Sequence, residues 1–147
     1  MSVILKVGGP PVPQPRARVA NVNGLVMSYV EKKHPIHAYR AMIAAEAKAA
    51  GMKPHPGIVD VSLAFVFERP KSHLRANGAL TPKALLLPPC DWDNLAKGVC
   101  DALIGIAYND DRQIRQCLVW KDYGRKAETV IEIVFRGMRC LTSWTTT

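Results

Sequence analysis

The nine residues Val59-Asp60-Val61-Ser62-Leu63-Ala64-Phe65-Val66-Phe67 place a large apolar side chain at every second position. Because successive side chains of a strand point to opposite faces of a sheet, this alternation predicts a strand with at least one buried face. A helical pattern precedes this strand over residues 35–50, and a second one follows it over residues 91–106. The centre of the chain therefore predicts a sheet that carries two helices.

Shorter alternating segments predict further strands at residues 3–7, 25–30, 114–121 and 128–135. A turn at residues 122–125 joins the last two strands, so we expect them to form a hairpin. The expected fold class is α/β (α+β), a small single domain with a mixed β-sheet and two main helices packed on it. This domain spans residues 1–136, and residues 137–147 form a C-terminal tail.

Residues 69–90 form a long connection that is rich in proline and in basic side chains. A connection of this length in a compact domain is typical of a functional loop or of a disordered segment. We expect a flexible basic loop that closes on a polyanion, with simple disorder as the alternative.

The charge balance of the chain is strongly basic. Twenty Lys and Arg residues stand against twelve Asp and Glu residues, which gives a net charge of +8 over 147 residues. Such a balance in a small protein favours a nucleic-acid partner, and a solvated basic surface is the alternative. No apolar run reaches 18 residues, so we expect no membrane span and a cytoplasmic protein.

The cysteines and histidines do not indicate a zinc site. No two cysteines have C-x-x-C spacing, and the histidines form no H-E-x-x-H motif. We expect free thiols in a reducing compartment. The cysteines are Cys90, Cys100, Cys117 and Cys140.

Five of the twelve carboxylates lie within the 21 residues from 91 to 111 of this basic chain. They are Asp91, Asp93, Asp101, Asp110 and Asp111. Carboxylates held close together repel one another unless a cation lies among them, so the cluster indicates a divalent metal site. A helix that packs back on the sheet is expected to bring Asp111 beside Asp91 and Asp93. Three carboxylates would suit Mg²⁺, which activates a retained water for attack on phosphate.

Each feature also has a purely structural interpretation. Asp91 or Asp93 suits the N-cap of a helix, and Asp110 and Asp111 suit a turn. Lys97 lies four residues after Asp93 and four before Asp101, so it suits ordinary i,i+4 ion pairs on a helix. In the catalytic interpretation Lys97 contacts the scissile phosphate or protonates the leaving oxygen.

Three fixed-spacing motifs, D-x-D-N-L-x-K, D-A-L-x-G and Y-x-D-D-x-Q-I, run through this region. They comprise Asp91, Asp93, Asn94, Leu95 and Lys97; Asp101, Ala102, Leu103 and Gly105; and Tyr108, Asp110, Asp111, Gln113 and Ile114. With these motifs the chain resembles the RusA family of Holliday junction resolvases, found in bacteria, prophages and phages. The resemblance covers most of the chain, from the first strand to about Phe135.

The resemblance implies a homodimeric endodeoxyribonuclease that depends on Mg²⁺, with Mn²⁺ as the alternative ion. Such an enzyme resolves four-way junction DNA by paired symmetric nicks in recombination and repair. The family's metal-binding catalytic aspartates match Asp91, Asp93 and Asp111, and its catalytic lysine matches Lys97. Supporting roles fall to Asn94, Asp101 and Asp110, and Asp101 is expected to orient Lys97.

Basic side chains outside the motifs are the expected DNA contacts. They are Arg16, Arg18, Arg69, Lys71, His73, Arg75 and Lys83. Two other functions remain open: a metal nuclease for other branched DNA, such as forks or flaps, and a non-catalytic basic DNA-binding module. The presence of all four catalytic positions favours catalysis, because carboxylates beside DNA repel phosphate and have no use in a module that only binds.

Overall fold

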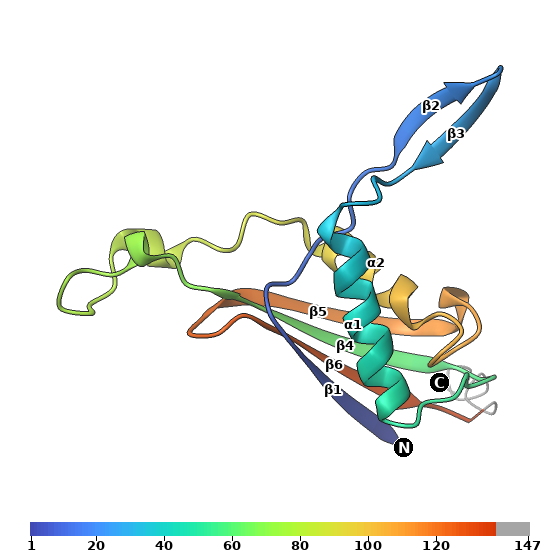
Figure 1. Cartoon of the computed structure of the whole chain (residues 1–147). Helices are drawn as coiled ribbons and strands as arrows, with labels where there is room; N and C mark the ends of the chain where they lie inside the picture. Colours follow the sequence, from blue (N-terminus) through green and yellow to red (C-terminus); the bar gives the residue numbers. More distant parts are fainter. Residues whose placement is uncertain (138–147) are drawn as a thin grey trace, which may run out of the picture.

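A computed structural model describes residues 1–137 as a mixed four-stranded sheet, two helices on one of its faces, and a hairpin that projects away from both layers (Figure 1). The strands are β1 (Ser2–Gly8), β2 (Arg18–Val22), β3 (Leu25–Tyr29), β4 (Val59–Glu68), β5 (Ile114–Gly124) and β6 (Glu128–Phe135). The helices are α1 (Pro35–Ala49) and α2 (Trp92–Leu103), with short 3₁₀ helices η1 (Lys71–His73), η2 (Pro82–Leu85) and η3 (Asp111–Gln113). The predicted mixed sheet with two main helices is confirmed. Cys140 and nearly all of the expected tail lie outside the described residues.

The strand order of the main sheet is β1-β6-β4-β5, with β4 antiparallel to β6 and parallel to β5. The predicted hairpin between residues 114–121 and 128–135 is therefore wrong, because β4 lies between β5 and β6. The three residues 125–127 are enough to cross one intervening strand, a span of about 10 Å. Ile131 and Ile133 of β6 are fully buried, which explains why this strand takes a central position.

The core lies between the helices and one face of the sheet. Val61, Leu63 and Phe65 of β4 are buried on this face, as their alternation predicted. Leu95, Val99 and Leu103 of α2 are fully buried, which confirms the predicted apolar stripe. The opposite face of the sheet has no helix on it among residues 1–137 (Figure 1).

Two boundaries differ from the sequence prediction. The second helix ends at Leu103 instead of residue 106, because Gly105 adopts a positive φ of 80° that breaks the helical path. Residues 18–22, where no strand was predicted, form β2 and pair with β3 across a turn at Asn23 and Gly24, which both have positive φ.

The hairpin of β2 and β3 is exposed along almost its whole length. The cross-strand pairs Ala20–Met27 and Val22–Leu25 give one of its faces an apolar surface.

No helix among the described residues is long and apolar enough to cross a membrane.

Candidate active site

The first two predicted ligands lie at the start of α2 with their carboxylates unpaired. Asp91 occupies the N-cap position, yet its side chain makes no capping hydrogen bond. Asp93 lies in the first turn, where its Oδ1 accepts a hydrogen bond of 2.9 Å from the backbone N–H of Asn94. Both residues are exposed, and neither forms an ion pair with any residue from 1 to 137. The capping interpretation of Asp91 is therefore wrong, and the positive end of the helix favours a cluster of negative charge here.

Hydrogen bonds to main-chain oxygens fix the start of α2 on the rest of the domain. The Lys121 ammonium of β5 donates to the carbonyl oxygens of Pro88 at 2.8 Å and Cys90 at 2.6 Å. The backbone N–H of Gln14 donates to the carbonyl oxygen of Asn94 at 2.9 Å. Asn94 thus supports the site through its main chain, by tying α2 to the segment between β1 and β2.

Lys97 belongs to a polar network that joins both helices. Its ammonium lies 3.5 Å from Oδ2 of Asp101, and the same oxygen accepts a hydrogen bond of 3.2 Å from Arg40 of α1. Arg40 also donates to the side-chain carbonyl of Gln14. Asp101 therefore forms ion pairs with two cations, and its role in orienting Lys97 stays a prediction. Arg40 and Gln14 were not predicted, and no spacing in the sequence marks them.

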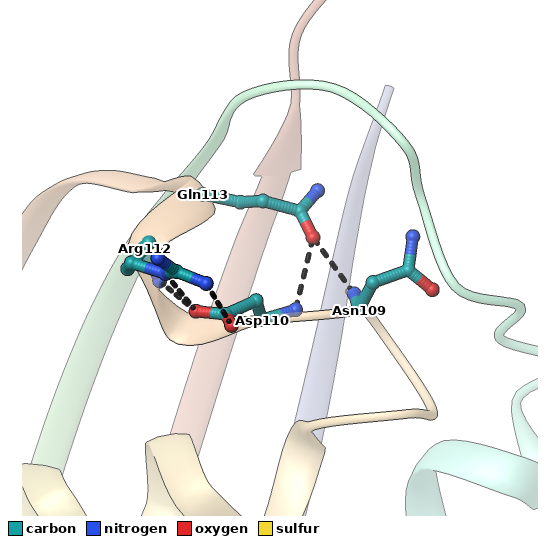
Figure 2. A network of polar contacts seen from close by, with 4 residues as sticks. All are labelled: Asn109, Asp110, Arg112 and Gln113. Atoms are coloured by element: carbon teal, nitrogen blue, oxygen red, sulfur yellow. Dashed lines mark hydrogen bonds and ion pairs between the residues drawn. The ribbon is translucent and has the colours of Figure 1, made fainter.

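The second acidic pair lies in the turn before β5, where its two members differ in their contacts. Asp110 caps η3, accepts from the backbone N–H of Arg112 at 2.8 Å, and forms an ion pair with the Arg112 side chain (Figure 2). Arg112 lowers the pKa of Asp110 to about 2. Asp111 is exposed and forms no ion pair among the described residues. The turn interpretation thus holds for Asp110, whereas the Asp111 carboxylate lies beside Asp110 and interacts with Arg112 only through its charge.

Gln113 holds this turn in shape with four side-chain hydrogen bonds. Its Oε1 accepts from the backbone N–H groups of Asn109 at 2.8 Å and Asp110 at 3.0 Å (Figure 2). Its Nε2 donates to the carbonyl oxygens of His55 and Gly57, each at 2.7 Å. The motif glutamine therefore connects the Asp111 turn to the segment before β4.

Tyr108 fixes the same turn through a buried contact with α2. It is fully buried, and its hydroxyl donates to the carbonyl oxygen of Cys100 in α2 at 2.7 Å. Burial, together with the neighbouring Cys100 thiol, raises the pKa of Tyr108 above its usual range, so the hydroxyl stays protonated as a donor. The motif Y-x-D-D-x-Q-I thus contains three structural residues that present one free carboxylate.

One chain does not bring the three predicted ligands together. Asp91 and Asp93 lie at the N-terminal end of α2, whereas Asp111 follows its C-terminal end. A 12-residue helix is about 18 Å long. Within residues 1–137 no three His, Cys, Asp or Glu side chains are grouped closely enough to hold a metal ion. The expectation that α2 brings Asp111 beside Asp91 and Asp93 in the same chain is therefore wrong, because the helix itself separates them.

Most of the basic residues predicted to contact DNA are exposed. Exposed side chains are those of Arg16, Arg18, Lys71, Arg75 and Lys83. His73 differs, because it is buried and its ring packs edge-on against Tyr123 at 4.9 Å between centroids. Arg69 lies over the same Tyr123 ring and donates to the carbonyl oxygen of Ala84. The burial of His73 argues against direct DNA contact, and Arg69 helps to hold the basic loop in place.

A second polar network, around Asp60, gave no signal in the sequence. The Asp60 carboxylate accepts from Arg115 at 3.1 and 2.7 Å and from Arg136 at 2.9 Å. Hydrogen bonds from Arg115 hold the pKa of Asp60 below its usual range. Asp60 occupies a position that faces away from the helices, so its role is to join β4, β5 and the end of β6.

None of the main hollows in residues 1–137 is lined by these carboxylates. One hollow of about 560 Å³ lies at the N-terminal end of β1 and is lined by residues such as Met1, Met52 and Phe135. Another, of about 660 Å³, lies beside the basic loop and is lined by residues such as Arg69 and Lys71. The carboxylates, Lys97 and the exposed bases are all on open surface, which suits a long polyanion better than a small ligand.

Comparison with known proteins agrees with a surface that suits a long polyanion. Residues 8–134 match the family model described as endodeoxyribonuclease RusA. The chain belongs to the RusA endodeoxyribonuclease family. Membership makes endonucleolytic hydrolysis of DNA its activity class, and the family is one of Holliday junction resolvases. The chain is also 32% identical over 133 residues to the uncharacterized protein YqaN of Bacillus subtilis (strain 168), covering 88% of this chain and 92% of YqaN.

Proposed function

We propose that this RusA-family protein is a Mg²⁺-dependent, structure-selective endodeoxyribonuclease that resolves Holliday junctions by paired symmetric nicks. Mn²⁺ is the alternative ion, and recombination and repair are the expected setting. The observation that carries the proposal is the difference among the five clustered aspartates. Asp101 and Asp110 are neutralised by bases of the same chain, while Asp91, Asp93 and Asp111 are exposed and without ion pairs among residues 1–137.

The donor set fits a hard divalent cation, because Asp91, Asp93 and Asp111 offer only carboxylate oxygens. When bound, Mg²⁺ supplies a nucleophilic water and neutralises charge on the phosphate. Lys97 lies one helical turn after Asp93, so its ammonium can contact the same phosphate or protonate the leaving oxygen. Asp101 lies 3.5 Å from this ammonium and limits its rotation.

The separation along α2 requires a second subunit in this proposal. Asp111 of one subunit would join Asp91 and Asp93 of the other, so a two-fold dimer would hold two equivalent sites. Two sites related by a two-fold axis are also what paired nicks in strands of like polarity require. In this proposal, the metal site is complete only in the homodimer.

The direct test is cleavage of an end-labelled four-way junction and of linear duplex of the same sequence, each with and without Mg²⁺. We expect symmetric cuts in the junction with Mg²⁺ and none in the duplex. Asp91→Asn, Asp93→Asn and Asp111→Asn should each abolish cutting while junction binding stays equal or tightens, since each removes a ligand and a repulsion of phosphate. Glu46→Gln, an equal charge change at an exposed position of α1, is the control and should cut normally.

Mixed dimers test whether each site needs both subunits. Asp91→Asn and Asp111→Asn proteins are inactive alone, yet a dimer with one of each contains one complete site if the ligands come from two subunits. Mixing them under exchange conditions should therefore restore single nicks. If all ligands came from one subunit, the mixture would stay inactive. Preferential cutting of forks or flaps would favour the other branched-DNA nuclease, and binding without cutting under any metal would favour the non-catalytic module.

A further inference from the structure

The hairpin of β2 and β3 is an uncharged arm on a strongly basic protein. Residues 19–30 carry no charged side chain, although 22% of the whole chain is charged. Apolar side chains are exposed on both faces of the arm: Val19, Leu25 and Val26 are 70%, 69% and 72% exposed. The two strands form a sheet of their own, which projects away from the main sheet (Figure 1). Because a two-stranded hairpin is only marginally stable in water, a partner that covers these side chains would stabilise the arm.

Cations surround the base of this arm. The exposed cations there that form no ion pair among residues 1–137 are Arg16, Lys32 and Lys33. Arg18 pairs with Glu31, the one acidic side chain of residues 16–33. Tyr29 and Glu31, together with the two lysines, line a hollow of about 440 Å³. Cations beside an aromatic ring are the groups that bind the phosphates and bases of a nucleic acid, so the base of the arm is complementary to DNA.

The base of the arm is fixed beside the start of α2. The backbone N–H of Gln14, four residues before β2, donates to the carbonyl oxygen of Asn94 at 2.9 Å. The side-chain carbonyl of Gln14 accepts from Arg40 of α1, so both helices hold this segment. Asn94 directly follows Asp93 and lies three residues after Asp91. DNA bound at these two carboxylates, as the proposed function requires, would therefore lie at the base of the arm.

The arm is longer than a DNA groove is deep. Each of its strands has five residues, which span about 17 Å at about 3.3 Å per residue. The major groove of B-DNA is only about 8.5 Å deep. An uncharged tip gains nothing from phosphates, whereas apolar side chains are stabilised where they replace stacking between bases. Opening a stacked step in a duplex costs free energy, but the stack is already interrupted at a branch point.

We propose that the β2–β3 arm inserts between bases at the branch point of the DNA substrate. Leu25 and Val26, just after the turn at its tip, contact the opened base step, and the cations at its base contact the flanking phosphates. This inference rests on the proposed function and adds the element that distinguishes branched DNA from duplex. A duplex offers the arm phosphates alone, whereas a four-way junction also offers an open step.

Fluorescence of a base at the branch point measures insertion directly. The adenine analogue 2-aminopurine brightens when it leaves the base stack. We would place it at the branch point of a four-way junction or, as the control position, within one arm of the junction, and add wild-type protein without divalent metal so that no strand is cut. We expect an increase at the branch point and no change within the arm. The absence of an increase at the branch point with saturating protein overturns the proposal.

Replacing the apolar tip separates insertion from binding to phosphates. Leu25→Thr/Val26→Thr removes apolar surface but keeps side chains that suit a strand. We expect this variant to bind the junction about tenfold or more weakly, to bind linear duplex as wild type does, and to leave the branch-point fluorescence low. Leu25→Ile/Val26→Ile, which keeps the tip apolar, and Ile4→Thr, which makes the same kind of change at a 61% exposed position of β1, are the controls and should match wild type.

Three results of this comparison would overturn insertion. Unchanged binding of both DNAs would show that the tip contacts neither, and an equal loss on junction and duplex would indicate a groove contact. A sedimenting mass that differs between the threonine variant and wild type would assign the arm to a second copy of the chain. Lys32→Gln/Lys33→Gln should weaken binding of both DNAs by the same factor, because phosphates are common to both, and a loss confined to the junction would contradict this role of the base.

Cleavage by the same proteins separates this inference from the proposed function. If wild type resolves junctions without any increase in branch-point fluorescence, insertion is wrong and the function stands. If the fluorescence increases and the threonine variant loses junction affinity, yet wild type cuts no branched DNA with Mg²⁺ or Mn²⁺, insertion stands and the proposed function fails.

Discussion

Replacing Gln113 with alanine should destabilise the domain, because this side chain is the hub of the turn that presents Asp111. Four hydrogen bonds are lost, to Asn109 and Asp110 on one side and to His55 and Gly57 on the other. At about 0.5–1.5 kcal/mol net for each bond, the sum is about 2–6 kcal/mol. Water can reach the exposed N–H of Asn109, so we expect a value in the lower part of this range, about 2–4 kcal/mol.

The assay is urea unfolding followed by circular dichroism, with Gln116→Ala as the control. Gln116 lies three residues later in β5, is exposed, and has no side-chain hydrogen bond within residues 1–137. For a chain of this size, a loss of about 3 kcal/mol lowers the melting temperature by about 6–12 °C, whereas the control should change little. Cleavage by folded Gln113→Ala should also need more Mg²⁺, because Asp111 is held less firmly.

Equal stability of Gln113→Ala and Gln116→Ala would refute this account of the turn. The motif glutamine would then act on DNA or on a partner instead of on the turn. A stability loss with unchanged Mg²⁺ dependence would keep the structural role but remove the link between Gln113 and the placement of Asp111.

Three further results are expected. Lys97→Ala should cut slowly even at saturating Mg²⁺ while losing only a few tenths of a kcal/mol of stability, because its pair with Asp101 is an exposed i,i+4 pair; full rescue by Mg²⁺ would make Lys97 a metal-binding residue. Arg115 lowers the folded-state pKa of Asp60, so the stability from this carboxylate is complete above the unfolded pKa of about 4 and is lost as the pH falls through the folded value. In urea unfolding, the free energies of wild type and Asp60→Asn should therefore converge in acid. A difference that stays constant with pH would contradict the ion pair. Junction affinity should fall about a thousandfold or more between 50 and 200 mM salt if about six to ten phosphates are contacted, and a flat response would exclude the exposed bases as the DNA surface.

The elements that the sequence predicts well are those whose signal is local. Alternation at residues 59–67 and 128–135 and the proline at the start of α1 each specify an element without reference to distant residues. Strand order is not local: residues 114–121 alternate as well as residues 128–135 do, and only the burial of Ile131 and Ile133 places β6 in the centre. Alternation therefore predicts that a strand exists but does not predict its neighbour.

The candidate site shows the same limit. Spacing identified Asp91, Asp93 and Asp111 as candidate ligands. The helix predicted over residues 91–106 already spans about 24 Å, and the structure shows that the chain does not return Asp111 to the start of this helix. Spacing also did not distinguish Asp110 from Asp111, because the difference comes from one neighbour, Arg112, which pairs with the first and not with the second. Of the two cations beside Asp101, the sequence predicted Lys97, which is four residues away on the same helix. It did not predict Arg40, which approaches from α1.

Within the motifs, some residues hold the local structure in place and others present the carboxylates of the proposed metal site. A carboxylate that must bind a metal cannot use its oxygens to hold itself in place, so neighbouring residues have to do so. Tyr108, Asp110 and Gln113 use their side chains to fix the turn, and Asp111 between them forms no ion pair among the described residues. At the start of α2 the buried stripe beginning at Leu95 and the main-chain bond at Asn94 do the same for Asp91 and Asp93. The chain thus holds each half of the proposed site firmly at one end of β5, with Asp111 before its first residue and Asp91 next to the carbonyl that Lys121 binds.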